Sequence, residues 1–196
     1  MEIMKFRRRC HVLHRIYHAK VPYQLYVEEG HKKMPRKFLD EKTYGEAIQA
    51  FVVVCADVVP INRKRQTFYL AKRSSKPFQG WWELGGRIFA GEPEDAAIGR
   101  ITKRETGLEL PTKRFTLIRQ NRYFCKDRQQ EPQDVGCDSL VFHYVVELSE
   151  EELQTASSNL DENEYEQVGL QEFDRQRIVS EYVSEAILDL YDTAFP

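Results

Sequence analysis

Apolar and polar residues alternate along the chain in blocks that predict a mixed α/β protein. Four apolar or alternating runs of strand length are bounded by turn-forming residues, and a short helix is expected before them at residues 39–50. The polar stretch at residues 126–138 is expected to be a loop between the last two strands. The predicted strands are residues 51–59, 67–72, 115–124 and 139–147.

Two further helices are predicted in the second half of the chain. One spans about residues 93–106, because Pro93 suits a first helical turn and Gly107 suits a C-terminal stop. The other spans residues 178–191, where apolar residues recur at helical spacing. Together with the strands, these helices indicate a mixed sheet flanked by helices. The apolar positions of the last helix are Ile178, Tyr182, Ile187, Leu188 and Tyr191.

Length and charge divide the chain into one domain and an extension. A chain of 196 residues with 41% hydrophobic residues can bury one sizeable core. Residues 1–37 hold ten Lys and Arg against three acidic residues, whereas the remainder holds 19 against 28. We therefore expect a basic N-terminal extension at 1–37, with a short edge strand at 21–27, and a folded domain at 38–196. Basic terminal segments are more often solvated or docked on their own acidic domain, so no nucleic-acid partner is expected.

The cysteines and the hydropathy indicate the cellular compartment in which the protein is expected. None of the four cysteines has CxxC spacing and no secretory leader precedes them, so we expect reduced thiols in the cytoplasm. No apolar run approaches membrane-spanning length, so no membrane partner is expected.

The segment from Gly85 to Leu108 carries the most informative pattern. Two glycines follow an apolar run and permit a sharp turn close to a ligand, and the helix at 93–106 follows. The spacing resembles the Nudix box of the Nudix hydrolases, which implies the Nudix fold, a mixed β-sheet sandwiched between helices. The matching residues are Gly86, Glu92, Arg100, Glu105, Gly107 and Leu108. We expect Arg100 to pair with Glu92 and to act structurally.

Two carboxylates of the Nudix box are missing. Ile101 replaces the glutamate after the arginine, and Arg104 replaces the first of a glutamate pair. A divalent cation takes about six oxygen ligands, so one glutamate cannot gather several ions, and Arg104 adds a repelling charge. The resemblance then implies a single Mg²⁺, with Mn²⁺ as an alternative, held by Glu105 and the carbonyl of Gly85.

The same two losses occur in the GDP-mannose mannosyl hydrolases, which the chain resembles from about residue 38 to residue 191. The similarity includes the strand end at 69–73, the loop at 77–82 and the strand at 143–146. It implies that Arg73 and Arg87 bind the substrate and stabilise the leaving group. It also places three more residues at substrate-contacting positions, with Tyr123 near an expected histidine. These residues are Asp57, Tyr123 and Tyr144.

A late loop departs from that subfamily. Asn163 and Glu164 stand where the subfamily has a metal-binding glutamine and a histidine base. Asn163 can still present an amide oxygen to the metal ion. Glu164 can serve as the general base or as a further metal ligand, and the sequence leaves both roles open.

These assignments predict a Mg²⁺-dependent hydrolase of a nucleotide sugar such as GDP-mannose. Water would attack the anomeric carbon and release GDP and the free hexose. Two alternatives stay open, namely cleavage of a phosphoanhydride in a nucleoside diphosphate derivative and a non-catalytic nucleotide-binding module. The resemblance also implies a homodimer.

Overall fold

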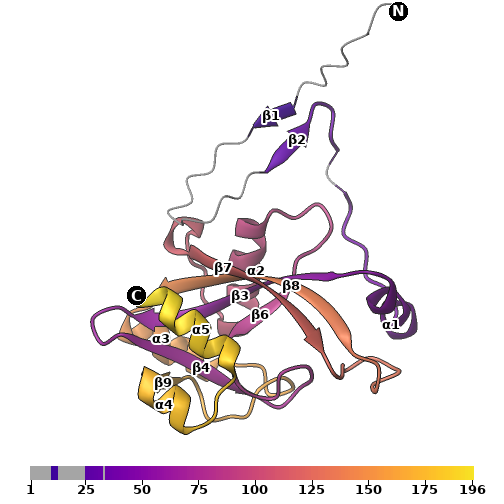
Figure 1. Ribbon diagram of the computed structural model, residues 1–196. Coiled ribbons are helices and arrows are strands. Elements are labelled where there is room, and N and C mark those ends of the chain that lie inside the picture. Colours follow the sequence, from indigo (N-terminus) through magenta and orange to yellow (C-terminus); the bar gives the residue numbers. More distant parts are fainter. Residues whose placement is uncertain (1–9, 13–24, 33) are drawn as a thin grey trace, which may run out of the picture.

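A computed structural model describes residues 10–12, 25–32 and 34–196 of the chain (Figure 1). In the N-terminal part, β1 (Cys10–Val12) and β2 (Tyr26–Glu28) form an antiparallel two-stranded sheet. The edge strand expected at residues 21–27 lies mostly outside the described residues, as does most of the basic extension.

The main sheet is organised around β3 (Val53–Asn62), which has neighbours on both edges. On one edge, β8 (Cys137–Glu147) runs parallel to β3 along its length. On the other edge, β6 (Leu84–Arg87) and β4 (Thr67–Arg73) both pair antiparallel with β3, at different points along it. The outer strands are β5 (Gly80–Trp82), β7 (Thr116–Cys125) and β9 (Gln171–Phe173). The mixed sheet expected from the sequence is confirmed.

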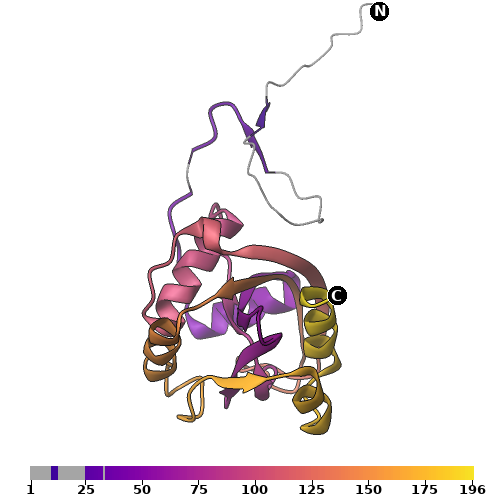
Figure 2. The same cartoon turned by 90° about the vertical axis from the view of Figure 1, so that its left-hand side faces the viewer.

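Helices cover both faces of this sheet (Figure 2). Because strand side chains alternate, Val58 and Tyr144 pack toward α2 and α3, whereas Val59 and Val145 pack toward α4 and α5. Two apolar cores therefore enclose the sheet. The helices are α1 (Glu41–Ala50), α2 (Glu94–Thr106), α3 (Glu150–Ser158), α4 (Arg175–Ser180) and α5 (Glu185–Ala194), with a 3₁₀ turn at Thr112–Arg114. No helix in the described part of the chain is long and apolar enough to cross a membrane.

The ends of α2 follow the local sequence closely. Pro93 is the N-cap residue with extended backbone angles, and Glu94 and Asp95 occupy the first turn, where the helix dipole favours negative charge. Gly107 ends the helix with a φ of 72°, a left-handed conformation that glycine adopts without a steric penalty. The predicted boundaries of this helix agree with the structure.

The single C-terminal helix expected at residues 178–191 is wrong, because the structure has two helices there. Asp174 caps the start of α4, and Ser184 caps a second start at α5. Between them Tyr182 has a φ of 52° and is 94% exposed, although we expected it on the buried stripe. The break allows Ile178 and Ile187, both fully buried, to pack on the same core.

Candidate active site

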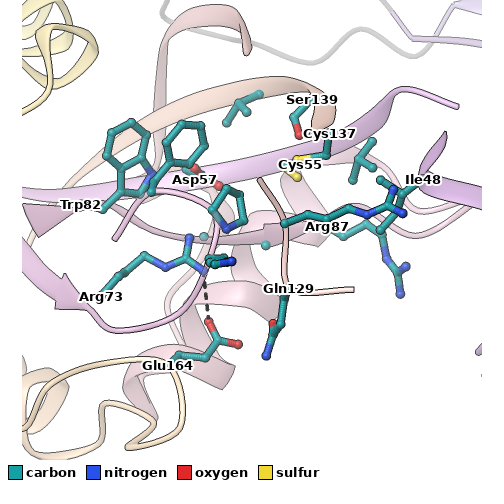
Figure 3. A pocket seen from close by; sticks show the side chains of 18 of the residues that line it. Ile48, Cys55, Asp57, Arg73, Trp82, Arg87, Gln129, Cys137, Ser139 and Glu164 are labelled. Carbon is teal, nitrogen blue, oxygen red and sulfur yellow. Dashed lines mark ion pairs between the residues drawn. The ribbon is translucent and has the colours of Figure 1, made fainter. Parts of the chain in front are cut away.

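A cavity of about 370 Å³ lies between β3, β6, β8, α1 and the loop after β7 (Figure 3). Its wall is rich in cationic side chains, and fewer acidic groups face them. This balance suits an anionic ligand such as a diphosphate. The cations are Arg73, Lys76, Arg87, Arg104 and Arg128, and the acids are Asp57, Glu83 and Glu164.

Asp57 and Gly85 lie opposite each other in the pairing of β3 with β6, and both face the cavity. A Cβ atom at residue 85 would lie 1.9 Å from Oδ1 of Asp57, so the carboxylate occupies space that only glycine leaves open. Burial, together with the charge of Glu83, raises the pKa of Asp57 to about 7. The cavity therefore contains a carboxyl group that titrates near neutral pH.

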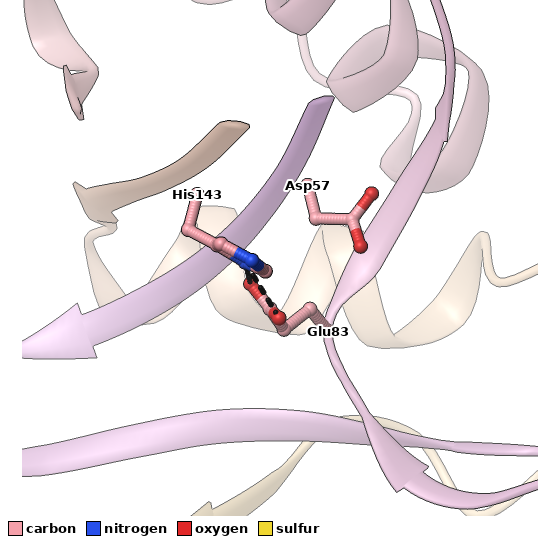
Figure 4. A group of neighbouring side chains, drawn as sticks. All are labelled: Asp57, Glu83 and His143. Carbon is pink, nitrogen blue, oxygen red and sulfur yellow. Dashed lines mark hydrogen bonds and ion pairs between the residues drawn. The ribbon is translucent and has the colours of Figure 1, made fainter. Parts of the chain in front are cut away.

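Asp57, Glu83 and His143 form a buried cluster beside the cavity (Figure 4). One ligand atom from each lies within 4.8 Å of the others, and Nδ1 of His143 lies 2.9 Å from the carboxylate of Glu83. Burial lowers the pKa of His143, but the charge and hydrogen bond of Glu83 together with the charge of Asp57 outweigh burial and leave this pKa raised. Two carboxylates and an imidazole are a ligand set that suits a divalent cation, so this cluster is a candidate metal centre.

Glu105 and the carbonyl of Gly85, which the sequence assigned to a metal ion, are bridged by Arg104. Nη2 of Arg104 donates to the Gly85 carbonyl at 2.9 Å, and its Nε donates to Oε1 of Glu105 at 2.7 Å. Glu105 is 1% exposed, and of its two carboxylate oxygens Oε2 makes no hydrogen bond to the described residues. Since Mg²⁺ needs about six oxygen ligands, the arrangement around Arg104 does not fit the expected ion.

Arg73 and Glu164 meet at the edge of the cavity. Arg73 at the end of β4 forms an isolated bridge with Tyr165, and the Ser74 N–H donates to the Glu164 carbonyl at 2.9 Å. These contacts hold the Glu164 carboxylate 4.0 Å from Nη2 of Arg73 (Figure 3). The Glu164 side chain is 36% exposed, so solvent water can reach it.

Arg87 and Arg100 have different surroundings. Arg87 lines the cavity, and its guanidinium lies 4.3 Å from the ring centre of Tyr44, a cation–π contact that orients the side chain. Arg100 instead donates from Nε and Nη2 to the two oxygens of Glu92, both at 2.7 Å. The structural pairing expected for Arg100 is confirmed.

Three residues that the sequence assigned to the site do not line the cavity. Tyr144 is 2% exposed and lies in the core under α2, because its neighbour His143 takes the cavity side of β8. Tyr123 contacts the cluster of Asp57, Glu83 and His143, with its hydroxyl 3.3 Å from Nε2 of His143. Asn163 is exposed, and its amide donates to Asp161 at 2.9 Å, so it does not join Glu105.

Sequence reasoning missed Glu83, His143 and Arg128. Glu83 joins β5 to β6 and His143 lies in β8, both among apolar residues, where an ionisable side chain was a signal that could have been weighed. Arg128 is 1% exposed and donates to the carbonyls of Gln130, Glu131 and Pro132, which orders the loop after β7. No sequence pattern separates it from an ordinary loop arginine.

Fold and cavity together define an α/β protein with a cavity rich in cationic side chains, beside a glycine turn and the helix that follows it. The chain belongs to the NUDIX domain family, whose model matches residues 52–185. Nudix hydrolases generally use a divalent metal ion, and the cluster of Asp57, Glu83 and His143 is the candidate position for one among the described residues.

Solved structures of other proteins share this fold. A MutT protein from Methanosarcina mazei is 15% identical over 72% of this chain and 91% of its own, with a TM-score of 0.52. The E. coli dihydroneopterin triphosphate pyrophosphohydrolase is 15% identical over 74% of this chain and 98% of its own, with a TM-score of 0.51. The NUDIX domain of Shewanella oneidensis NrtR, solved with ADP ribose, is 17% identical over 74% and 89%, with a TM-score of 0.50. At these identities the likeness establishes the fold alone.

Proposed function

We propose that this chain hydrolyses a nucleotide sugar of the GDP-mannose type by water attack at the anomeric carbon. The observation that carries this proposal is the Glu164 carboxylate beside Arg73, at a cavity whose Nudix box retains one of its usual helix carboxylates. A base next to a diphosphate-binding arginine is the arrangement that this reaction needs.

Three arginines support the choice of a diphosphate. Arg73, Arg87 and Arg104 reach the cavity from β4, β6 and α2. Guanidinium groups bind phosphate oxygens through paired hydrogen bonds, and they stabilise the charge that grows on the β-phosphate as it leaves. The NrtR domain with ADP ribose is consistent with a nucleoside diphosphate joined to a sugar as the ligand class.

The reaction can be written with this chain's own side chains. Glu164 takes a proton from water, and the water oxygen bonds to the anomeric carbon from the face opposite the diphosphate. The bond from that carbon to the phosphate oxygen breaks, and its electron pair stays with the departing GDP. The hexose leaves with inverted configuration. No step of this reaction uses the Mg²⁺ or Mn²⁺ that the resemblance implies, because Arg104 contacts the two ligands expected for the ion, Glu105 and the Gly85 carbonyl.

Attack at phosphorus is the second candidate, and the Asp57, Glu83 and His143 cluster favours it. A divalent cation held by this cluster could activate water against a phosphoanhydride. The pyrophosphohydrolase from E. coli is a neighbour whose name indicates such chemistry.

Turnover in ¹⁸O-labelled water separates the two reactions. GDP-mannose and other nucleotide sugars are incubated with the enzyme, with Mg²⁺ and then with EDTA. Label in the hexose supports carbon attack, whereas label in the phosphate product rejects it. Absence of turnover with the whole panel would favour a nucleotide-binding module.

The base is tested by Glu164→Gln. We expect its kcat to fall by about 10²- to 10⁴-fold, because general base catalysis contributes that much. Glu166→Gln is the matched control, since Glu166 lies in the same loop and pairs with Lys72 at 2.9 Å. Equal activity of the two variants would remove Glu164 from the mechanism.

A further inference from the structure

We infer that the guanidinium of Arg104 permanently occupies the cation position of the Nudix box and binds ligand phosphate there in place of a metal ion. Its hydrogen bonds to the Gly85 carbonyl and to Glu105 use the two groups that the resemblance assigned to Mg²⁺. The inference about phosphate rests on the proposed function, whereas the inference about the cation position does not.

The backbone leaves room for this arginine. A Cβ atom at residue 86 would lie 2.8 Å from Nη2 and 3.3 Å from Nη1 of Arg104, so a larger residue would displace the guanidinium. The two box glycines thus have separate tasks. Gly85 admits the carboxylate of Asp57 on the cavity side, and Gly86 admits Arg104.

A cation at this point stabilises the buried carboxylate of Glu105. Its side chain is 1% exposed, and a buried carboxylate without a partner is strongly destabilising. Arg104 is the residue that forms an ion pair with Glu105 among the described residues. A metal ion could take the position only after the guanidinium had left both groups.

The other side of the guanidinium is available to a ligand. Nη1 makes no hydrogen bond within the described part of the chain, and the Arg104 side chain is 48% exposed. Arg104 lines the same cavity as Arg73 and Glu164. A phosphate oxygen in this cavity can therefore accept a hydrogen bond from Nη1 while Nε and Nη2 remain bound to the protein.

Mn²⁺ binding followed by electron paramagnetic resonance tests the cation position without any substrate. Wild type, Arg104→Ala, Glu105→Gln and the double variant are titrated, with Lys103→Ala as the matched control. Lys103 is in the same helical turn and pairs with Glu109 at 2.7 Å, away from the cavity. We expect Arg104→Ala to gain a Mn²⁺ site at least about tenfold tighter than any that wild type has at Glu105, and the double variant to lose this gain.

The comparison of wild type with Glu105→Gln is decisive even if Arg104→Ala does not fold. Mn²⁺ held by the Asp57 cluster should be the same in both proteins. Wild-type binding that disappears in Glu105→Gln would overturn the inference, and so would an Arg104→Ala variant that folds and binds Mn²⁺ as wild type does.

Calorimetry with GDP in EDTA tests the phosphate contact. We expect wild type to bind GDP without metal, Arg104→Ala to bind at least about tenfold more weakly and Arg104→Lys to lie between them. Equal GDP affinity of wild type and Arg104→Ala would overturn the phosphate contact. Failure of wild type to bind GDP or any tested nucleotide sugar would count against the proposed function, while the Mn²⁺ result would stand.

Discussion

The Asp57 carboxylate lies where the side chain of residue 85 would begin, with 1.9 Å between its Oδ1 atom and the ideal Cβ position. Gly85→Ala should therefore force the carboxylate or the β3–β6 pair to move. We expect a loss of about 1–3 kcal/mol in unfolding free energy, the usual cost of overpacking, together with loss of activity. Denaturant unfolding measures the first effect.

Gly99→Ala is the matched control for that substitution. Gly99 lies in α2, and the nearest atom to its ideal Cβ is 3.9 Å away. Alanine should stabilise the helix by about 0.5–1 kcal/mol. Stabilisation by both alanines would contradict the packing of Asp57 over Gly85.

The raised pKa of Asp57 predicts that the folded chain is less stable at neutral and high pH than at acidic pH. Burial and Glu83 raise this pKa to about 7, so the folded chain keeps a proton that the unfolded chain releases near pH 4. Stability should then fall as pH rises from about 4 to 7. Asp57→Asn has no carboxyl group to lose a proton there. We therefore expect its melting temperature to rise relative to that of wild type between pH 5 and pH 8. A melting temperature that falls relative to wild type over this interval would contradict the shift.

The lowered pKa of Glu152 predicts that the folded chain loses stability at acidic pH. Arg114 donates to both oxygens of Glu152, and the Ser149 N–H donates to one of them, which lowers the pKa of Glu152 to about 2. A carboxylate with a lowered pKa contributes stability above its ordinary pKa of 4.5, and this contribution is lost as pH falls toward 2.

Urea unfolding at pH 7, 4.5 and 3 measures the Glu152 contribution. Glu152→Gln should be destabilised by about 1–2 kcal/mol at pH 7, allowing for partial exposure, and should approach wild type at pH 3. Glu151→Gln, a neighbour on the exposed side of α3, is the control. A constant difference at all three pH values would exclude the ion pair as its cause.

We predict that the conformation of the loop at residues 126–136 depends on the Arg128 side chain. Its guanidinium donates to three carbonyls of the loop that forms part of the cavity wall. Arg128→Ala should cost about 2–4 kcal/mol and make residues 126–136 sensitive to limited proteolysis. Lys126→Ala, an exposed change in the same loop, should do neither.

The sequence predicted the fold and part of the site for physical reasons that the structure makes clear. Regular spacing located α2 and its cap at Gly107, and the box placed Gly85 beside Glu105 through backbone geometry. Arg73, Arg87 and Glu164 do line the cavity. Their roles in binding and catalysis stay predictions, as do the homodimer and the separate N-terminal extension.

Other features depend on three-dimensional placement that spacing does not contain. The resemblance placed Tyr144 at a substrate-contacting position, but the pleat of β8 turns its ring into the core and His143 toward the other face. The contact of Arg104 with Glu105 depends on the rotamers of adjacent residues, and the sequence indicated only repulsion of a metal ion.

The alternation of β8 also limits how this protein can evolve. His143 and Tyr144 are neighbours in the chain but lie on opposite faces of the sheet. Deleting one residue upstream in the strand would turn an imidazole into the apolar core and a phenol ring toward Asp57 and Glu83. New specificities on this strand should therefore arise by exchange of single side chains, whereas insertions and deletions should be confined to the loop that precedes it.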